Sequence, residues 1–167
     1  MSGKVKILDI KQVNQKINRL AWQVYEHNSQ QKEIVIVGVD TRGLIIAKEL
    51  AKIIKKISHL DITLGHLKLD KESPYNKPID LNLSSEAYIN KVVVICDDVL
   101  NSGKTLIYAA RHFLKTPLLK LSTVVLVDRN HNKYPIKSDY VGLSLATTLQ
   151  EYVNVSLEGA DKGVYLS

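Results

Sequence analysis

Short apolar segments alternate with longer amphipathic segments along most of the chain. The apolar segments are rich in Val and Ile, which is typical of strands buried on both faces of a parallel sheet. The amphipathic segments repeat their apolar residues at helical spacing, as Val13, Ile17 and Leu20 do after a possible N-cap at Asp9. The pattern predicts strands at residues 33–39, 60–69, 91–97 and 122–128 and helices at residues 10–27, 43–57 and 104–115.

This alternation predicts an α/β domain with a central, mostly parallel sheet flanked by helices. The tail differs, because residues 140–145, 151–157 and 163–166 are short alternating segments with no helix between them. They predict a small antiparallel unit. Residues 69–90 have weak periodicity and several turn-forming residues, and a loop of that length in a compact domain is usually functional or disordered.

Size and composition indicate one soluble globular domain. The chain has 167 residues, of which 45% are hydrophobic and 24% charged. No apolar run approaches the ~20 residues that a membrane crossing needs, and the N-terminus lacks a signal-peptide core. The single cysteine, Cys96, excludes an internal disulfide and a cysteine-based zinc cluster, and we interpret it as a small buried apolar residue. We therefore expect a cytoplasmic protein with no membrane partner.

The net charge of +6 would suit nucleic acid or a phosphorylated small molecule as ligand. A solvated, lysine-rich surface is the simpler explanation. Arginine binds phosphate in a bidentate manner, so the positions of the arginines are more informative than the total charge. The chain has four of them, at Arg19, Arg42, Arg111 and Arg129.

The segment VVVICDDVLNSGKT, residues 92–105, combines an expected buried strand with two adjacent carboxylates and a small polar loop. Ligands of open parallel sheets bind beyond the carboxyl ends of the strands, where Asp97 and Asp98 are expected. The loop opens a helix, and the first turn of a helix binds phosphate. A P-loop is disfavoured because Asp98 replaces its first glycine. Carboxylates for ribose hydroxyls beside a phosphate loop predict a sugar-phosphate ligand; the alternative is a capped helix after two solvated aspartates.

This segment resembles the phosphoribosyl-pyrophosphate (PRPP) signature of type I phosphoribosyltransferases, in which two acids precede a Thr/Ser-Gly-x-Thr loop. GVDTRG at residues 38–43 is similar to the pyrophosphate loop of that family, and residues 125–142 resemble the hood that receives the base. The resemblance is closest to the bifunctional pyrimidine-operon regulator/uracil phosphoribosyltransferase branch and covers roughly residues 7–158. It implies the type I phosphoribosyltransferase fold in a single domain over residues 1–167, with a mobile loop at about 66–85 and a small hood at about 129–167.

The resemblance also implies an activity and its residues. The implied reaction transfers ribose 5-phosphate from PRPP to a nucleobase, with uracil as the leading candidate, in a Mg²⁺-dependent homodimer. Catalytic roles are implied for Asp97, Asp98, Arg42 and His66, and Mg²⁺ would be held by the two aspartates through water or ribose hydroxyls. The other implied binding residues are Val99, Leu100, Asn101, Ser102, Gly103, Lys104 and Thr105 for the ribose and 5′-phosphate, Asp40, Thr41, Arg42 and Gly43 for pyrophosphate, and Asp128, Arg129, Val141 and Gly142 for the base.

Two departures from the branch keep alternatives open. His66 stands where the branch carries a loop arginine, and a neutral histidine is a poor substitute on pyrophosphate, so Lys68 or Lys71 would have to supply the charge. Members of the branch bind RNA through a basic face, which is weakened in this chain. The alternatives to an enzyme are a PRPP- or nucleotide-sensing, RNA-binding regulator of pyrimidine genes and a PRPP-binding protein with little catalysis; RNA is the less favoured partner. The RNA-face departures are Trp22 in place of a histidine and Leu143 and Leu149 in place of lysines.

Overall fold

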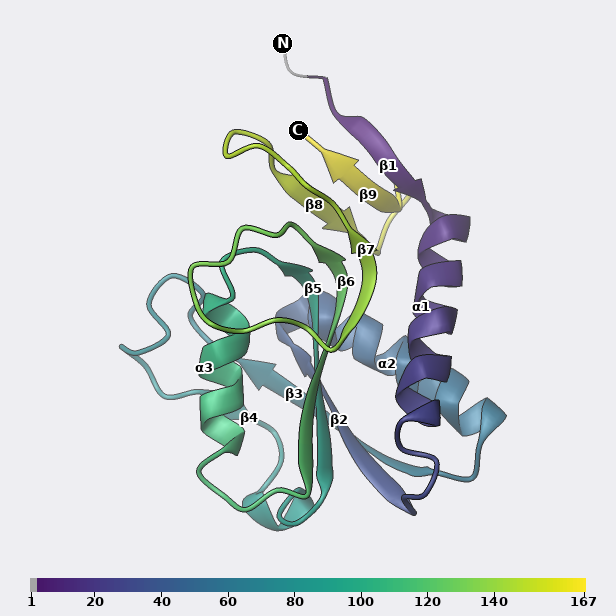
Figure 1. The fold of residues 1–167 in the computed structure, drawn as a ribbon, viewed down its shortest axis with the longest axis vertical. Helices are drawn as coiled ribbons and strands as arrows, with labels where there is room; N and C mark the ends of the chain where they lie inside the picture. The colour runs from purple at the N-terminus through teal and green to yellow at the C-terminus, as the bar shows by residue number, and fades with distance from the viewer. Residues whose placement is uncertain (1–2) are drawn as a thin grey trace.

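A six-stranded sheet lies at the centre of the computed structural model, which describes residues 3–167 (Figure 1). All neighbouring strands are parallel except one pair at the edge, so the predicted mostly parallel sheet is confirmed. Across the sheet the strands are β4 (Asp80–Leu81), which forms the antiparallel pair, β3 (Asp61–Lys68), β2 (Glu33–Val39), β5 (Val92–Leu100), β6 (Lys120–Asp128) and β7 (Tyr140–Ser144).

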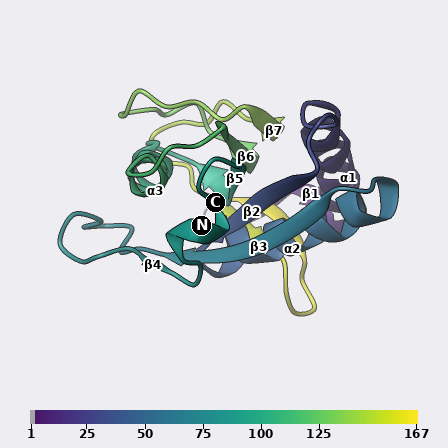
Figure 2. The same cartoon turned by 90° about the horizontal axis from the view of Figure 1, so that it is seen from below.

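Helices cover both faces of this sheet. Helices α1 (Ile10–Glu26) and α2 (Asp40–Ile57) lie on one face, and α3 (Lys104–Phe113) lies on the other (Figures 1 and 2). Successive residues of a strand point to opposite faces. Ile36 of β2 therefore packs into the core beneath α1 and α2, and Val37 packs into the core beneath α3. Among residues 3–167, none of the helices combines the length and hydrophobicity that a membrane crossing requires.

A smaller antiparallel sheet at one end of the molecule contains strands from both ends of the chain (Figure 1). Its strands, in order, are β1 (Val5–Asp9), β9 (Gly163–Leu166) and β8 (Val153–Ser156). The predicted antiparallel unit is confirmed for β8 and β9. It is wrong for residues 140–145, because β7 joins the large sheet in parallel with β6. The crossover between β6 and β7 contains no helix, so no helical periodicity marks it as a parallel connection.

The start of α1 agrees with the sequence prediction. The N-cap at Asp9 is confirmed, because its carboxylate accepts from the Gln12 N–H at 2.8 Å and the Gln12 side chain accepts from the Asp9 N–H at 2.9 Å.

Other element ends differ from the sequence prediction. Helix α2 begins at Asp40 instead of residue 43, and Asp40 itself has φ 51°, directly after the extended Val39. Within the segment expected to be mobile, about 66–85, residues 66–68 belong to β3 and residues 80–81 to β4, and residues 69–79 between them form a loop.

Close contact between α2 and β5 brings the two expected ligand loops together. A Cβ atom on Gly43 would lie 2.5 Å from the backbone oxygen of Cys96 and 3.3 Å from Cα of Asp97. No side chain fits at that distance. Glycine therefore allows the start of α2 to pack directly against the end of β5.

We expect Gly43→Ala to lower the free energy of unfolding by about 1–3 kcal/mol, because backbone atoms of α2 and β5 would have to separate. In an unhindered helix the same change stabilises the protein by roughly 0.5–1 kcal/mol. The sign of the change in unfolding free energy therefore tells whether the Cβ atom is hindered. Urea unfolding measures the difference. Gly3→Ala is the control, since nothing lies within 4 Å of its Cβ position. A Gly43→Ala variant as stable as the parent would contradict the close contact.

Candidate active site

A pocket of about 320 Å³ lies where the carboxyl ends of β5 and β6 meet the beginning of α3. This is the edge at which open parallel sheets bind ligands. The pocket is polar, and it combines carboxylates, cations and backbone donors. Its lining consists of Arg42, Lys71, residues 97–106, Arg129, Tyr152 and Val153.

Two adjacent carboxylates lie buried at the base of the pocket. Asp97 is 2% exposed and Asp98 5% exposed. The Arg42 guanidinium lies 3.3 Å from Asp98 Oδ2. The Lys71 ammonium lies 3.6 Å from Asp97 Oδ1 and 3.7 Å from Asp40 Oδ2. Buried charges are costly unless they are paired, so these two cations stabilise the acidic pair.

Burial raises the pKa of Asp97 well above its usual range, and the neighbouring Asp98 carboxylate raises it further, while Lys71 opposes both effects. Burial by itself would lower the pKa of Lys71, but the charges of Asp97, Asp98 and Asp40 outweigh it and raise that pKa. Lys71 therefore stays protonated at neutral pH. The ionised form of Asp97 therefore costs free energy in the folded state, and additional positive charge or hydrogen-bond donors near it would reduce that cost.

The loop before α3 presents backbone donors to the same pocket. Gly103 ends this loop with φ 86°, a conformation that favours glycine, and its hypothetical Cβ would lie 2.7 Å from the Ile136 side chain. Gly103 is the N-cap residue of α3, and it has no side chain that could accept hydrogen bonds from the first turn. The Ser102 hydroxyl accepts from the Lys104 N–H at 3.3 Å. An uncapped helix start beside a hydroxyl is suited to a phosphate group.

Arg129 connects the loop before α3 to the small-sheet end of the molecule. It is 4% exposed. It donates to Asn101 Oδ1 at 3.1 Å, to Thr147 Oγ1 at 3.1 Å and to the carbonyl oxygens of Thr148 and Glu151. Because its donors are used within the protein, Arg129 holds two walls of the pocket at a fixed distance.

The structure brings most of the predicted site residues together. Asp97 to Thr105, Arg42 and Arg129 line the pocket, and Asp40 reaches it through Lys71. Thr41 lines a neighbouring hollow between α2 and β8, and Gly43 provides the close contact with β5. The Asp128 carboxylate accepts from the Asn130 N–H at 2.8 Å and shapes the turn after β6. The ligand-binding roles of these residues remain predictions.

The structure does not bring His66 into the pocket. His66 lies in β3 opposite Gly38 of β2, and its N–H donates to Asn82 Oδ1 at 2.7 Å. Of the two lysines that the sequence offered in its place, Lys71 contacts the acidic pair, whereas Lys68 ends β3 and faces solvent. The catalytic role of His66 remains a prediction that this geometry does not favour.

Val141 and Gly142 are also outside the pocket lining. They lie inside β7, and their carbonyl oxygens accept from the Arg19 guanidinium at 3.1 and 2.6 Å. Sequence reasoning missed Tyr152 and Val153, which line the pocket instead. Neither belongs to a motif, and only the packing of the small sheet brings them near Asn101. The Tyr152 ring lies 5.7 Å from the Arg129 guanidinium carbon.

We expect Asp97→Asn to be more stable than the parent at pH 7, because the amide removes a buried charge that the folded state disfavours. A raised pKa means that ionised Asp97 destabilises the folded state above its unfolded pKa of about 4. The gain should therefore shrink as the pH falls below the raised pKa of the folded state, and it should vanish below about 4, where the group is protonated in both states. Urea unfolding at several pH values measures this, with the exposed Asp61→Asn as control. Lower stability of Asp97→Asn across the whole pH range would refute the argument.

Comparison with known proteins agrees with this geometry. A family model described as phosphoribosyl transferase domain matches residues 5–158. The chain is 36% identical over 172 residues to the Bifunctional protein PyrR of Thermoanaerobacter sp. (strain X514), covering 97% of this chain and 95% of that protein. It is 34% identical over 172 residues to the Bifunctional protein pyrR of Enterococcus faecalis (strain ATCC 700802 / V583), covering 95% and 94%.

Solved structures with the same fold include a hypoxanthine-guanine phosphoribosyltransferase (hpt-2) from Bacillus anthracis, with a TM-score of 0.76, 21% identity and coverage of 97% of this chain and 96% of that chain. A hypoxanthine phosphoribosyltransferase from Staphylococcus aureus has a TM-score of 0.71 and 25% identity, with coverage of 89% and 80%. The fold and the family that the motifs indicated are both confirmed. The chain belongs to the type I phosphoribosyltransferase family, and its curated relatives at this level of identity include bifunctional PyrR proteins.

Proposed function

We propose that the protein transfers ribose 5-phosphate from PRPP to uracil and releases pyrophosphate. One observation carries this proposal: the buried Asp97–Asp98 pair and the uncapped start of α3 face a single pocket. Carboxylates beside a phosphate-binding helix start match a ribose that bears a 5′-phosphate. The choice of uracil rests on the resemblance to the branch that contains uracil phosphoribosyltransferases.

Different lining residues would bind different parts of the ligand. The two aspartates would accept hydrogen bonds from the ribose hydroxyls, and the backbone from Asn101 to Thr105 would hold the 5′-phosphate. Arg42, at the start of α2, would pair with pyrophosphate. Tyr152 and Val153 border the remaining side of the pocket, where the base would enter.

We propose Mg²⁺ as the cofactor, because the acidic cluster fits it. Asp97 and Asp98 offer the hard oxygen ligands that this ion prefers, and the Lys71 ammonium between Asp97 and Asp40 shows that the pocket attracts positive charge. Within residues 3–167, no group of three or more His, Cys, Asp or Glu could hold a metal alone. Mg²⁺ commonly keeps several waters and shares substrate oxygens, so two carboxylates suffice. When bound, it would neutralise charge on pyrophosphate.

The chemical step needs binding and charge balance more than covalent help from the protein. A ring nitrogen of the base forms a bond to C1 of the ribose while the bond from C1 to the pyrophosphate oxygen breaks, and the proton on that nitrogen leaves to solvent. The aspartates would stabilise positive charge on the ribose. Arg42 and Lys71, which contact the acidic pair, would stabilise negative charge on the leaving group. Loop 69–79 would exclude water that could otherwise hydrolyse PRPP.

A second candidate is a PRPP-binding regulator with little catalysis. The position of His66 outside the pocket favours this candidate. Among the described residues, 3–167, Lys71 is then the one cation that loop 69–79 contributes to the pocket lining. Binding of RNA by such a regulator is less supported. Arg19 donates to the carbonyls of Val141 and Gly142, so it is not a free surface cation.

Pyrophosphate release from PRPP and Mg²⁺ tests the proposal, with uracil, hypoxanthine and guanine as acceptors. We expect release with uracil, and we expect Asp98→Asn to lower kcat/KM by about 100-fold or more, as loss of a key electrostatic contact typically does. Asp61→Asn is the matched control. PRPP binding without release, lost in Asp98→Asn, would favour the regulator. Release with a purine alone would reassign the base, and absence of PRPP binding would refute both candidates.

We expect Lys71→Met to lower kcat/KM by about 10- to 100-fold, because the loop would lose the cation that faces the leaving group. Lys71→Arg keeps the charge and should retain most of the activity. Lys68→Met is the control, since Lys68 is exposed at the end of β3. Equal activity of Lys71→Met and Lys68→Met would remove Lys71 from the mechanism.

A further inference from the structure

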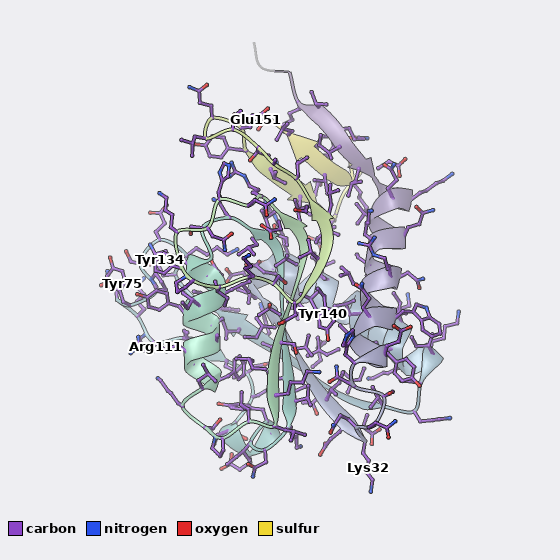
Figure 3. All side chains as sticks on the ribbon, in the orientation of Figure 1. Lys32, Tyr75, Arg111, Tyr134, Tyr140 and Glu151 are labelled. Carbon is purple, nitrogen blue, oxygen red and sulfur yellow. The ribbon has the colours of Figure 1, made fainter. Side chains whose placement is uncertain are left out.

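A second pocket of about 430 Å³ lies between loop residues 74–79 and α3, and it shares no lining residue with the first. The loop forms one wall, and one face of α3 with the turn that follows it forms the other. Figure 3 shows Tyr75 and Arg111 together beside α3. The residues that α3 and its following turn contribute are spaced three and four apart, as expected for one helix face: Tyr108, Arg111, His112 and Lys115.

The second pocket is lined by cations without carboxylates. Arg111 and Lys115 come from the helix side and Lys77 comes from the loop, and no lining residue is acidic. Within residues 3–167, none of the ion pairs includes any of these three cations. The end of a helix carries a partial negative charge of only about half a unit, so three full positive charges dominate there. The pocket therefore favours an anion.

Aromatic rings form the remaining polarisable surface. Tyr108 is central: the Tyr75 ring lies 6.5 Å from it, tilted by 48°, and the Tyr134 ring lies 6.5 Å from it, edge-on at 70°. Tyr134 supports Tyr108 from outside the pocket, whereas Tyr75 is 64% exposed on the loop. Figure 3 places Tyr134 and Tyr75 near each other beside α3. A planar ring that entered the pocket would contact Tyr108, which Tyr134 holds in place, and the exposed Tyr75, which can move with its loop.

We propose that this second pocket binds a mononucleotide, with its phosphate on Arg111, Lys115 and Lys77 and its base against Tyr108 and Tyr75. Arginine and lysine pair with phosphate, and aromatic rings stack on bases whatever their sequence. The volume lies within the range usual for small-molecule sites. An inorganic anion would use the cations alone and leave the tyrosines without a role.

The loop that closes this pocket also reaches the candidate active site. Lys71 contacts Asp97, and the Lys104 ammonium donates to the carbonyl oxygen of Glu72. Tyr75 and Lys77 lie a few residues further along the same loop. A nucleotide held between residues 74–79 and α3 restrains the segment that carries Lys71. The site is thus an effector site that limits how freely the loop moves, independent of which base the enzyme uses.

Hydrogen–deuterium exchange with mass spectrometry tests the proposal, because it locates binding by segment. Adenosine 5′-monophosphate at millimolar concentration should slow exchange in residues 74–79 and 108–115, apart from any effect on residues 97–105. Arg111→Gln/Lys115→Gln should abolish the first effect and weaken that binding by about tenfold or more. The matched control is Lys52→Gln/Lys55→Gln on the exposed face of α2. Tyr108→Leu should weaken binding of the nucleotide but not of inorganic phosphate.

Three results would overturn the proposal. The first is protection confined to residues 97–105, which would place the nucleotide only in the acidic pocket. The second is equal protection by inorganic phosphate, which would mean that the rings recognise nothing. The third is an RNA hexamer that binds more tightly than the mononucleotide and extends protection to residues 133–137, which would assign the surface to a strand. A cooperative thermal transition of each variant confirms that it is folded.

Discussion

The burial of two adjacent carboxylates at the end of β5 is the constraint on which the rest of this site depends. A lone ionised carboxylate in an apolar interior costs several kcal/mol, and neighbouring like charges add to the cost. Arg42 from α2 and Lys71 from loop 69–79 offset part of that cost. Three separate segments of the chain therefore converge on one acidic pair. The site is held together by charge before any ligand arrives.

Close packing at two glycines, where no side chain would fit, fixes the positions of those segments relative to one another. Gly43 brings the start of α2 against the Cys96 carbonyl, and Gly103 lets the loop before α3 pass beside Ile136. Arg129 then ties Asn101 of that loop to Thr147. The backbone that we propose binds the ligand is thus fixed from both sides of the sheet, and electrostatic stabilisation of a reacting group requires such rigidity.

Loop 69–79 is the part of the site with the least burial. Its inner side carries Lys71 toward the acidic pair, and its outer side carries Tyr75 toward α3. Few of its residues are buried, which is typical of segments that open at low free energy and agrees with the lid that we propose. Under our proposals, a ligand on one side would change the equilibrium on the other, because both sides belong to one short segment.

The sequence by itself determined the sheet, the helices and the acidic pair, because each has a local signal. Runs of Val and Ile mark the strands, Asp9 caps α1 through its own neighbours, and the residues from Asp97 to Thr105 are contiguous in the chain. Tertiary structure decided the rest. It paired β7 in parallel across a crossover that has no helix, selected Lys71 over Lys68 and His66, and brought Tyr152 to the pocket. These outcomes depend on contacts between residues far apart in the chain, and no local pattern of hydrophobicity or charge encodes such distances.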